Sequence, residues 1–182
     1  MHTAWHPSRA VPRAKRPAVL WDWLLDPTSL TQRLQAVCGE FRVEVLQSAW
    51  LRPAHDERRA LGLRADQRAL VREVFLLCDG QPWVFARTVI PRETLSGKYR
   101  RLTHLGSRSL GAVLFSDKTM RRGEVHVAQL ASTHALYARA AQRLARKPPG
   151  LWGRRSLFFL RDRPLLLSEI FLHDMNSCNT PT

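Results

Sequence analysis

The chain of 182 residues lacks the sequence features that would assign it to a function class at once. It has no run of about 18 apolar residues, the length that a membrane-spanning helix needs. Prolines interrupt its first residues, so no apolar signal-peptide segment is present and we expect no export. Glycine-rich phosphate-binding motifs, the zinc-protease motif and the nucleophile elbow are also missing. Motifs of these kinds therefore give no indication of its chemistry.

Cysteine is scarce, and the three cysteines are Cys38, Cys78 and Cys178. They lie far apart and form no C-x-x-C pair, which argues against a disulfide framework and against a zinc site. This usage is typical of a protein of the reducing cytoplasm, which is the location that we expect. The seven histidines show no metal-ligand spacing. We therefore expect no metal site.

Acidic residues are also few, 15 against 29 lysines and arginines, which gives a net charge of +14. Most of this charge lies in residues 1–18 and 121–155. A basic chain can bind nucleic acid or another polyanion, with an affinity that falls steeply with salt. Solvated arginines explain the charge equally well. The expected helix 30–38 carries a single arginine, Arg33, which is poor for a DNA-reading helix. We therefore expect no nucleic-acid partner.

The length and the apolar content of 45% fit one globular domain with a sizeable core. We expect a basic, disordered tail at residues 1–18, because this segment is polar and rich in proline. The folded domain should span residues 19–175, with a basic helical insertion at 131–149. Residues 176–182 are polar and should form a second tail.

The pattern of apolar residues predicts a mixture of helices and strands. We expect helices at residues 19–25, at 30–38 behind the N-cap Ser29, and after Ser109. Strands are expected at residues 41–50, within 120–130, and in a C-terminal hairpin formed by 157–160 and 165–172. This order of elements predicts an α+β domain with an antiparallel sheet.

The strongest local signal is a hairpin over residues 69–91 with Asp79-Gly80 at its turn. A two-residue turn would place Arg72 opposite Arg87. Both arginines would then share a face with four apolar side chains (Val74, Leu76, Trp83 and Phe85). Like charges directly opposite each other are destabilising, so an anion should lie between them.

A third charge, Glu169, alternates with Leu165, Leu167 and Phe171 in the last strand and should share their face. The three charges allow two interpretations. They could form a structural Arg–Glu–Arg network, or the arginines could extend to water. Alternatively, two cations and one carboxyl could bind a dianionic ligand and act on it. The nearby Trp152-Gly153-Arg154-Arg155 segment is more typical of a turn with solvated arginines than of a phosphate site.

Five segments, taken together and in order, resemble the chorismate pyruvate-lyase family over residues 20–175: DPTSLTQRL, VREVFLLCDGQPWVFARTVIP, LGSRSLGAVLF, LWGRRS and RPLLLSEIFL. The resemblance implies a lyase that converts chorismate to 4-hydroxybenzoate and pyruvate for ubiquinone synthesis. It implies no cofactor, a single α+β domain with helices around an antiparallel sheet, and a buried site under helical lids. On this basis we expect a monomeric cytoplasmic enzyme whose partners are its substrate and product, without membrane insertion.

The resemblance also implies site residues. It places the contact to the ring carboxylate at Arg72, the contact to the C4 oxygen at Glu169, and backbone contacts at Leu30 and Leu110. Arg87 matches a second arginine of the family's site. Our hypothesis is that Arg72 binds the ring carboxylate and Arg87 the enolpyruvyl carboxylate. Glu169 would be the proton donor or hydrogen-bond partner at the bridging oxygen, so Glu169 and Arg72 are the catalytic candidates.

The main alternative is a binding module. The effector-sensing domains of some bacterial transcription regulators resemble the lyase fold and bind small acids without turnover. Such a regulator would carry a winged-helix domain before the sensing domain, and residues 1–40 do not resemble one.

Overall fold

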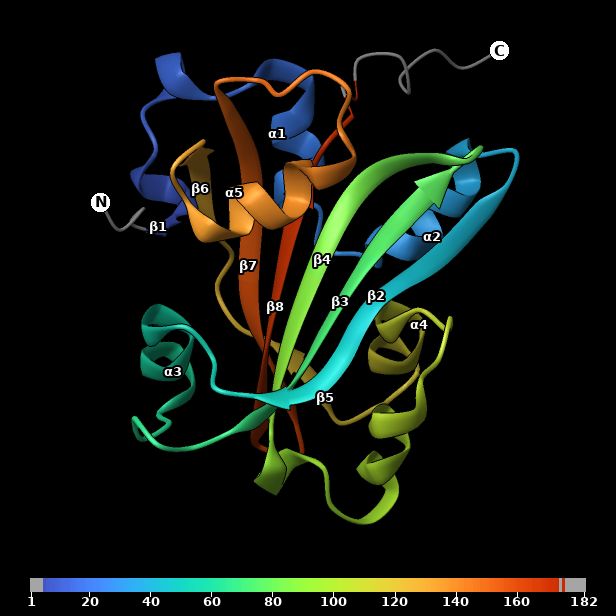
Figure 1. Cartoon of the computed structure of the whole chain (residues 1–182), viewed down its shortest axis with the longest axis vertical. Helices are drawn as coiled ribbons and strands as arrows, with labels where there is room; N and C mark the ends of the chain where they lie inside the picture. Colours follow the sequence, from blue (N-terminus) through green and yellow to red (C-terminus); the bar gives the residue numbers. More distant parts are fainter. Residues whose placement is uncertain (1–4, 174, 176–182) are drawn as a thin grey trace.

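An antiparallel β-sheet of eight strands runs through the centre of the protein (Figure 1). The computed structural model describes residues 5–173 and 175. The strands follow the order β1-β6-β7-β8-β4-β3-β2, and β5 pairs with the end of β7. Their bounds are β1 (His6–Pro7), β2 (Phe41–Leu51), β3 (Ala69–Cys78), β4 (Gln81–Pro91), β5 (Met120–Arg122), β6 (His126–Ala131), β7 (Gly150–Leu160) and β8 (Arg163–Phe171). The prediction of an α+β fold with an antiparallel sheet is confirmed.

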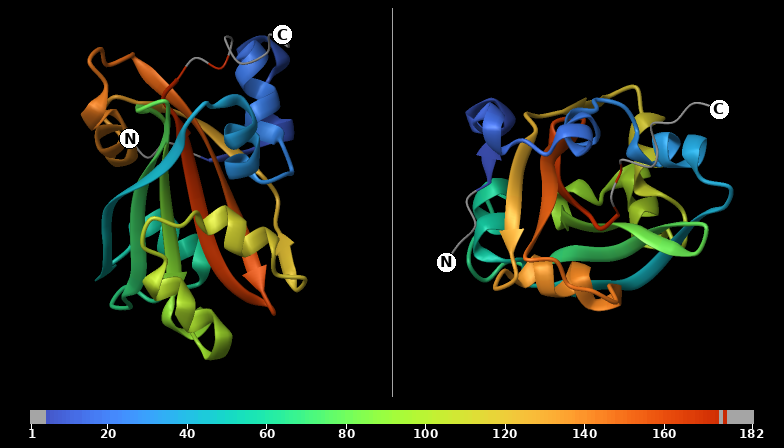
Figure 2. Two further views of the ribbon diagram at one scale, coloured as in Figure 1. Left: turned by 90° about the vertical axis from the view of Figure 1, so that its right-hand side faces the viewer. Right: turned by 90° about the horizontal axis from the view of Figure 1, so that it is seen from above.

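Helices cover both faces of the sheet, as the two views of Figure 2 show. The lid face, which we define by Leu70, Arg72, Val74 and Leu76 of β3, packs against the first set: α1 (Ala18–Leu25), α2 (Leu30–Val37), the 3₁₀ helix η4 (Gly97–His104) and α4 (Leu110–Phe115). The back face, defined by Val71, Glu73, Phe75 and Leu77, packs against the second: α3 (His55–Leu61) and α5 (Ala135–Ala140). The remaining 3₁₀ segments are η1 (Ser8–Ala10), η2 (Arg13–Lys15), η3 (Arg92–Thr94) and η5 (Ala141–Arg143).

The central hairpin has the predicted turn but a different register. Asp79 and Gly80 both have positive φ values, 50° and 77°, as a tight two-residue hairpin turn requires. Leu77 then pairs with Pro82, whereas Leu76 pairs with Val84. One extra residue, Trp83, is therefore inserted into β4 as a bulge.

This bulge reverses the faces of the residues that follow it, because side chains alternate along a strand. Arg72 pairs with Thr88, and Arg87 pairs with Glu73 on the back face. The prediction that Arg72 and Arg87 face each other was wrong. Phe85 likewise belongs to the core of the back face, packed against Phe75.

Residues 5–17 do not form the disordered tail that their composition predicts. β1 pairs with β6 at the edge of the sheet, and Trp5 and Val11 are buried. The segment 131–149 is helical only over α5 and η5, and three of its apolar residues, Leu136, Tyr137 and Ala140, pack into the core of the back face. The predicted tail 176–182 lies outside the described residues.

Cys38 and Cys78 form a disulfide bond, so the prediction from cysteine spacing was wrong. The fold brings the end of α2 against the turn of the β3–β4 hairpin, although the two cysteines are 40 residues apart in sequence. The Asp79 carboxylate strengthens this junction by accepting hydrogen bonds from the backbone N–H groups of Glu40 (2.7 Å) and Gly39 (3.3 Å). Cysteine usage therefore no longer supports a reducing compartment.

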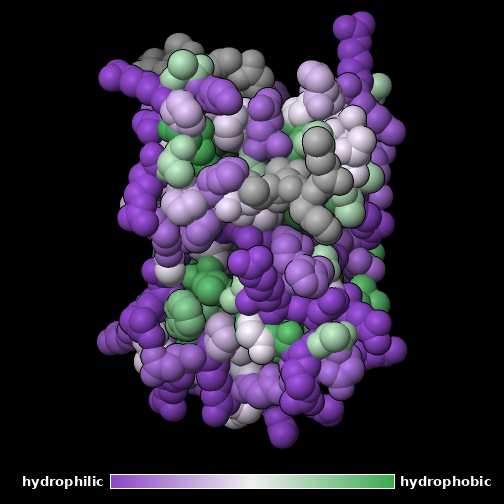
Figure 3. All heavy atoms as spheres, turned by 90° about the vertical axis from the view of Figure 1, so that its left-hand side faces the viewer, coloured by the Kyte–Doolittle hydropathy of each residue, from purple (hydrophilic) through white to green (hydrophobic). Residues whose placement is uncertain are grey.

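Among the described helices, none is long and apolar enough to cross a membrane. Hydrophilic side chains cover most of the side of the molecule that Figure 3 shows, and the apolar side chains visible on it form small separate patches. Several arginines of the basic segments pair with acidic residues at the surface, as Arg143 does with Glu44 at 2.7 Å. Part of the positive charge is therefore offset locally.

Removing the disulfide should destabilise the fold. A covalent link across 40 residues restricts the unfolded chain, so we expect Cys38→Ser to lower the free energy of unfolding by about 2–4 kcal/mol. Urea unfolding with and without dithiothreitol measures the effect. Wild type under reducing conditions should match Cys38→Ser, and equal stability of the oxidised wild type and the variant would contradict the bond's role.

Candidate active site

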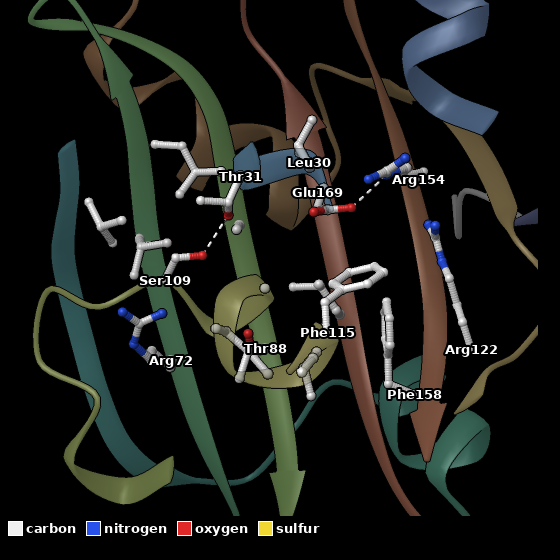
Figure 4. Close-up of a pocket in the computed structure, with 18 of the residues that line it drawn as sticks. Leu30, Thr31, Arg72, Thr88, Ser109, Phe115, Arg122, Arg154, Phe158 and Glu169 are labelled. Atoms are coloured by element: carbon white, nitrogen blue, oxygen red, sulfur yellow. Dashed lines mark hydrogen bonds and ion pairs between the residues drawn. The ribbon is translucent and has the colours of Figure 1, made fainter. Parts of the chain in front are cut away.

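A small cavity lies between the lid face of the sheet and the helices α2 and α4 (Figure 4). Its volume is about 30 Å³. Apolar side chains from β2, β3, β4, β7 and β8 form much of its wall. Its polar lining residues are Thr28, Thr31, Arg72, Thr88, Ser109, Arg122, Arg154 and Glu169. A mostly apolar cavity with a few convergent polar groups is the usual form of a small-molecule site.

The two lid helices, α2 and α4, meet the cavity at their N-terminal ends. Leu30 and Leu110 are their first residues, and both line the cavity. The side chains of Thr31 and Ser109 are hydrogen-bonded to each other at 2.5 Å, which joins the two helices. A Cβ on Gly111 would lie 3.1 Å from the Thr31 hydroxyl, so glycine allows this close approach. The sequence-predicted positions Leu30 and Leu110 are thus brought together at one wall.

Arg72 lies at one side of the cavity, on β3 (Figure 4). It is 4% exposed, and its Nη2 donates hydrogen bonds to the backbone oxygens of Gly106 (2.9 Å) and Arg108 (3.0 Å). No carboxylate among residues 5–173 forms an ion pair with it. Burial lowers the pKa of Arg72 to about 10, so the side chain still carries its charge at neutral pH.

Glu169 lies at the other side of the cavity, on β8, and its carboxylate is paired with an arginine. Its Oε2 accepts a hydrogen bond from Nε of Arg154 on β7 at 2.6 Å. Arg154 is 2% exposed, and its Nη1 also donates to the backbone oxygens of Trp23 (2.8 Å) and Asp26 (3.0 Å). The interpretation of Arg154 as a solvated turn residue was wrong. The strand β7 begins at Gly150, seven residues before the predicted one, and this places Arg154 inside the sheet.

Arg122 is a second arginine that the sequence did not single out. It lies on β5 opposite Phe158 of β7, and it lines the cavity beside Arg154 and Glu169 (Figure 4). Its Nη1 donates to the backbone oxygen of Asp26 at 2.9 Å, and its Nε donates to the Ser156 hydroxyl at 3.2 Å. Burial, together with the nearby charge of Arg154, lowers the pKa of Arg122 to about 10, although the charges of Glu169 and Asp26 act in the opposite direction. Only the strand character of residues 120–130 could have indicated its position.

Arg87, a predicted member of the site, does not line this cavity. It lies on the back face, where its Nε and Nη2 bind the two carboxylate oxygens of Glu57 at 2.7 and 3.0 Å. Its Nη1 binds Glu73 at 2.6 Å. Burial lowers the pKa of Arg87, but the hydrogen bonds and charges of these two carboxylates outweigh burial and raise it overall. The substrate-binding role expected for Arg87 is incompatible with this position.

No cluster of three or more histidine, cysteine, aspartate or glutamate side chains that could hold a metal ion is present in the described parts of the chain. The chemistry of the cavity residues is that of anion binding and hydrogen bonding. Three guanidinium groups and one carboxylate surround a mostly apolar space.

Comparison with known proteins identifies one family that this chain resembles over nearly its whole length. A family model described as chorismate lyase matches residues 2–177. A protein of Azoarcus sp. (strain BH72) named "Probable chorismate pyruvate-lyase" is 47% identical over 170 residues, which cover 91% of this chain and 87% of that protein. A protein of the same name from Nitrosomonas europaea is 41% identical over 169 residues, 93% of each chain.

Solved structures share the fold at low identity. PhnF from Mycobacterium smegmatis has a TM-score of 0.58 at 18% identity, over 87% of this chain and 68% of that one. A GntR-family transcriptional regulator from Bacillus cereus has a TM-score of 0.56 at 11% identity, over 79% of this chain and 99% of that one. These similarities concern the fold alone.

Replacing Arg87 should reduce stability. Arg87→Gln removes the counter-charge of the buried Glu57 and one of the two that pair with Glu73, whose other partner is Arg139, and breaking a buried ion pair in this way typically costs about 3–5 kcal/mol. Urea unfolding measures the loss. Arg59→Gln, an exposed arginine of α3, is the matched control and should stay within about 0.5 kcal/mol of wild type. Equal stability of Arg87→Gln and wild type would mean that the network contributes nothing.

Proposed function

Since the chain belongs to the chorismate lyase family, we propose that it is a cofactor-independent lyase that converts chorismate to 4-hydroxybenzoate and pyruvate. The observation that supports this reaction most strongly is the arrangement of the cavity. A buried arginine lies at one side and a carboxylate at the other, with an apolar space between them. As part of the same proposal, the enzyme is monomeric and its product enters ubiquinone biosynthesis. A cytoplasmic location follows from the family alone, since the Cys38–Cys78 disulfide is typical of an oxidising compartment.

The substrate fits this arrangement end to end. Arg72 binds the ring carboxylate, helped by backbone N–H groups of Leu30 and Leu110 at the positive ends of α2 and α4. Glu169 faces the opposite end of the ring. The strands that carry Arg72 and Glu169 are two spacings apart in the sheet, about 10 Å at ~4.8 Å per spacing. The two side chains can therefore contact opposite ends of one six-membered ring.

The reaction breaks the bond between ring carbon C3 and the enolpyruvyl oxygen. The electron pair of this bond leaves with the oxygen, the ring loses the hydrogen on C4, and the enolpyruvyl methylene gains a hydrogen to give pyruvate. Formation of the aromatic ring supplies the driving force. Glu169, positioned by its contact with Arg154, accepts a hydrogen bond from the C4 hydroxyl and fixes the ring. The protein then contributes orientation and charge stabilisation.

The cavity of about 30 Å³ is much smaller than the ~150 Å³ of an apolar cavity that binds benzene. The lid helices must therefore separate to admit the substrate. The Thr31–Ser109 hydrogen bond is one contact that this opening breaks.

The activity has a direct test. Purified protein mixed with chorismate in buffer with a chelator should release 4-hydroxybenzoate and pyruvate in equal amounts. We expect the Glu169→Ala chain, still folded by circular dichroism, to lose most of this turnover, because the ring is no longer fixed. Tight binding of 4-hydroxybenzoate without turnover would instead indicate a small-acid sensor, in line with the fold shared with transcriptional regulators.

The role of Arg72 has its own test. Arg72→Ala removes a charge-assisted contact worth about 1.5–3 kcal/mol, so the affinity for 4-hydroxybenzoate should fall roughly 10- to 100-fold. Isothermal titration calorimetry measures it. Arg59→Gln, an exposed arginine of α3, is the control, and it should bind within threefold of wild type. Unchanged affinity in Arg72→Ala would refute the assignment.

A further inference from the structure

We propose that Arg122 binds the enolpyruvyl carboxylate of chorismate and so distinguishes substrate from product. This inference rests on the proposed lyase function. The substrate carries two carboxylates, whereas 4-hydroxybenzoate keeps only the ring carboxylate. A second cation in the cavity is therefore needed for the substrate alone, and Arg87 cannot supply it because it lies on the back face.

The cavity offers three arginines, and their partners differ. Arg72 lies at the side assigned to the ring carboxylate. Arg154 is already paired with Glu169 and donates to backbone oxygens of the segment that ends α1. Arg122 donates hydrogen bonds only to neutral groups, a hydroxyl and a backbone oxygen. The charges of Glu169 and Asp26 act on it from nearby, but no carboxylate of residues 5–173 forms an ion pair with it, and burial outweighs their effect. A partly buried guanidinium with neutral partners favours an anionic ligand.

The position of Arg122 also suits the second carboxylate. The enolpyruvyl group is attached at C3, next to the C4 oxygen that Glu169 contacts, so it lies on the Glu169 side of the cavity. The strand β7 lies beside both Glu169 and Arg122. Its residue Arg154 is the strand partner of Glu169, and its residue Phe158, four positions further along, is the strand partner of Arg122. Figure 4 shows the Arg122 side chain extending toward Arg154 on this side, opposite Arg72.

The two charges on this side have different tasks. Arg154 neutralises Glu169, which remains in place through the reaction. Arg122 neutralises a carboxylate that leaves with pyruvate. After cleavage its contact is lost, while the Arg72 contact to the ring carboxylate remains. Arg122 therefore contributes to binding of chorismate and not of 4-hydroxybenzoate.

The test compares substrate and product affinity in Arg122→Gln. We expect KM for chorismate to rise 10- to 100-fold, while Kd for 4-hydroxybenzoate by calorimetry stays within threefold of wild type. Arg122→Lys, which keeps the charge, should recover part of the loss. Arg121→Gln is the matched control, because Arg121 is exposed and pairs with Asp162 at the surface. Its KM and Kd should not change.

Three results would overturn the proposal. An unchanged KM in Arg122→Gln would exclude the contact. An equal loss of affinity for substrate and product would show that Arg122 has only a structural role, through its hydrogen bond to the backbone oxygen of Asp26. No recovery in Arg122→Lys, together with unchanged folding, would exclude a charge effect. If wild type forms no 4-hydroxybenzoate, the lyase function itself fails, and calorimetry with chorismate on wild type and Arg122→Gln still decides the contact.

Discussion

A single inserted residue, Trp83 in β4, decides which face of the sheet each following side chain of that strand occupies. Without the bulge, Arg87 would lie beside Arg72 and the cavity would hold a pair of opposed cations. With it, Thr88 takes that position and Arg87 binds two carboxylates on the other face. The chemistry of both faces therefore depends on one irregularity of the ladder, at the end of the hairpin remote from the charges.

The buried arginines of the two faces differ in their partners. On the back face, Arg87 has two carboxylate partners, and Glu73 also accepts a hydrogen bond from Gln47 at 2.8 Å, so the network is closed. On the lid face, Arg154 is paired with Glu169, whereas Arg72 and Arg122 donate hydrogen bonds only to neutral groups among the described residues. Burial of an uncompensated cation costs free energy that a bound anion recovers. The lid face is therefore arranged for a ligand, and the back face for stability.

Local signals in the sequence predicted local structure well. Asp79-Gly80 indicated the turn, and the N-caps of α2 and α4 were recognisable as Ser29 and Ser109. The features that were missed depend on distant contacts. Trp83 has no side-chain property that marks a bulge, and the partners of Arg154 come from a helix more than 120 residues earlier. The disulfide, too, joins cysteines whose sequence spacing says nothing about their distance in the fold.

The disulfide between Cys38 and the hairpin has a mechanical consequence for α2. The helix has eight residues and is about 12 Å long, with its far end covalently anchored and its near end at the cavity. Any displacement of the helix is then a rotation about this fixed pivot. Leu30, at the end of the helix remote from the disulfide, moves furthest, whereas the residues next to Cys38 hardly move. The amplitude of the motion is thus concentrated where the helix meets the ligand.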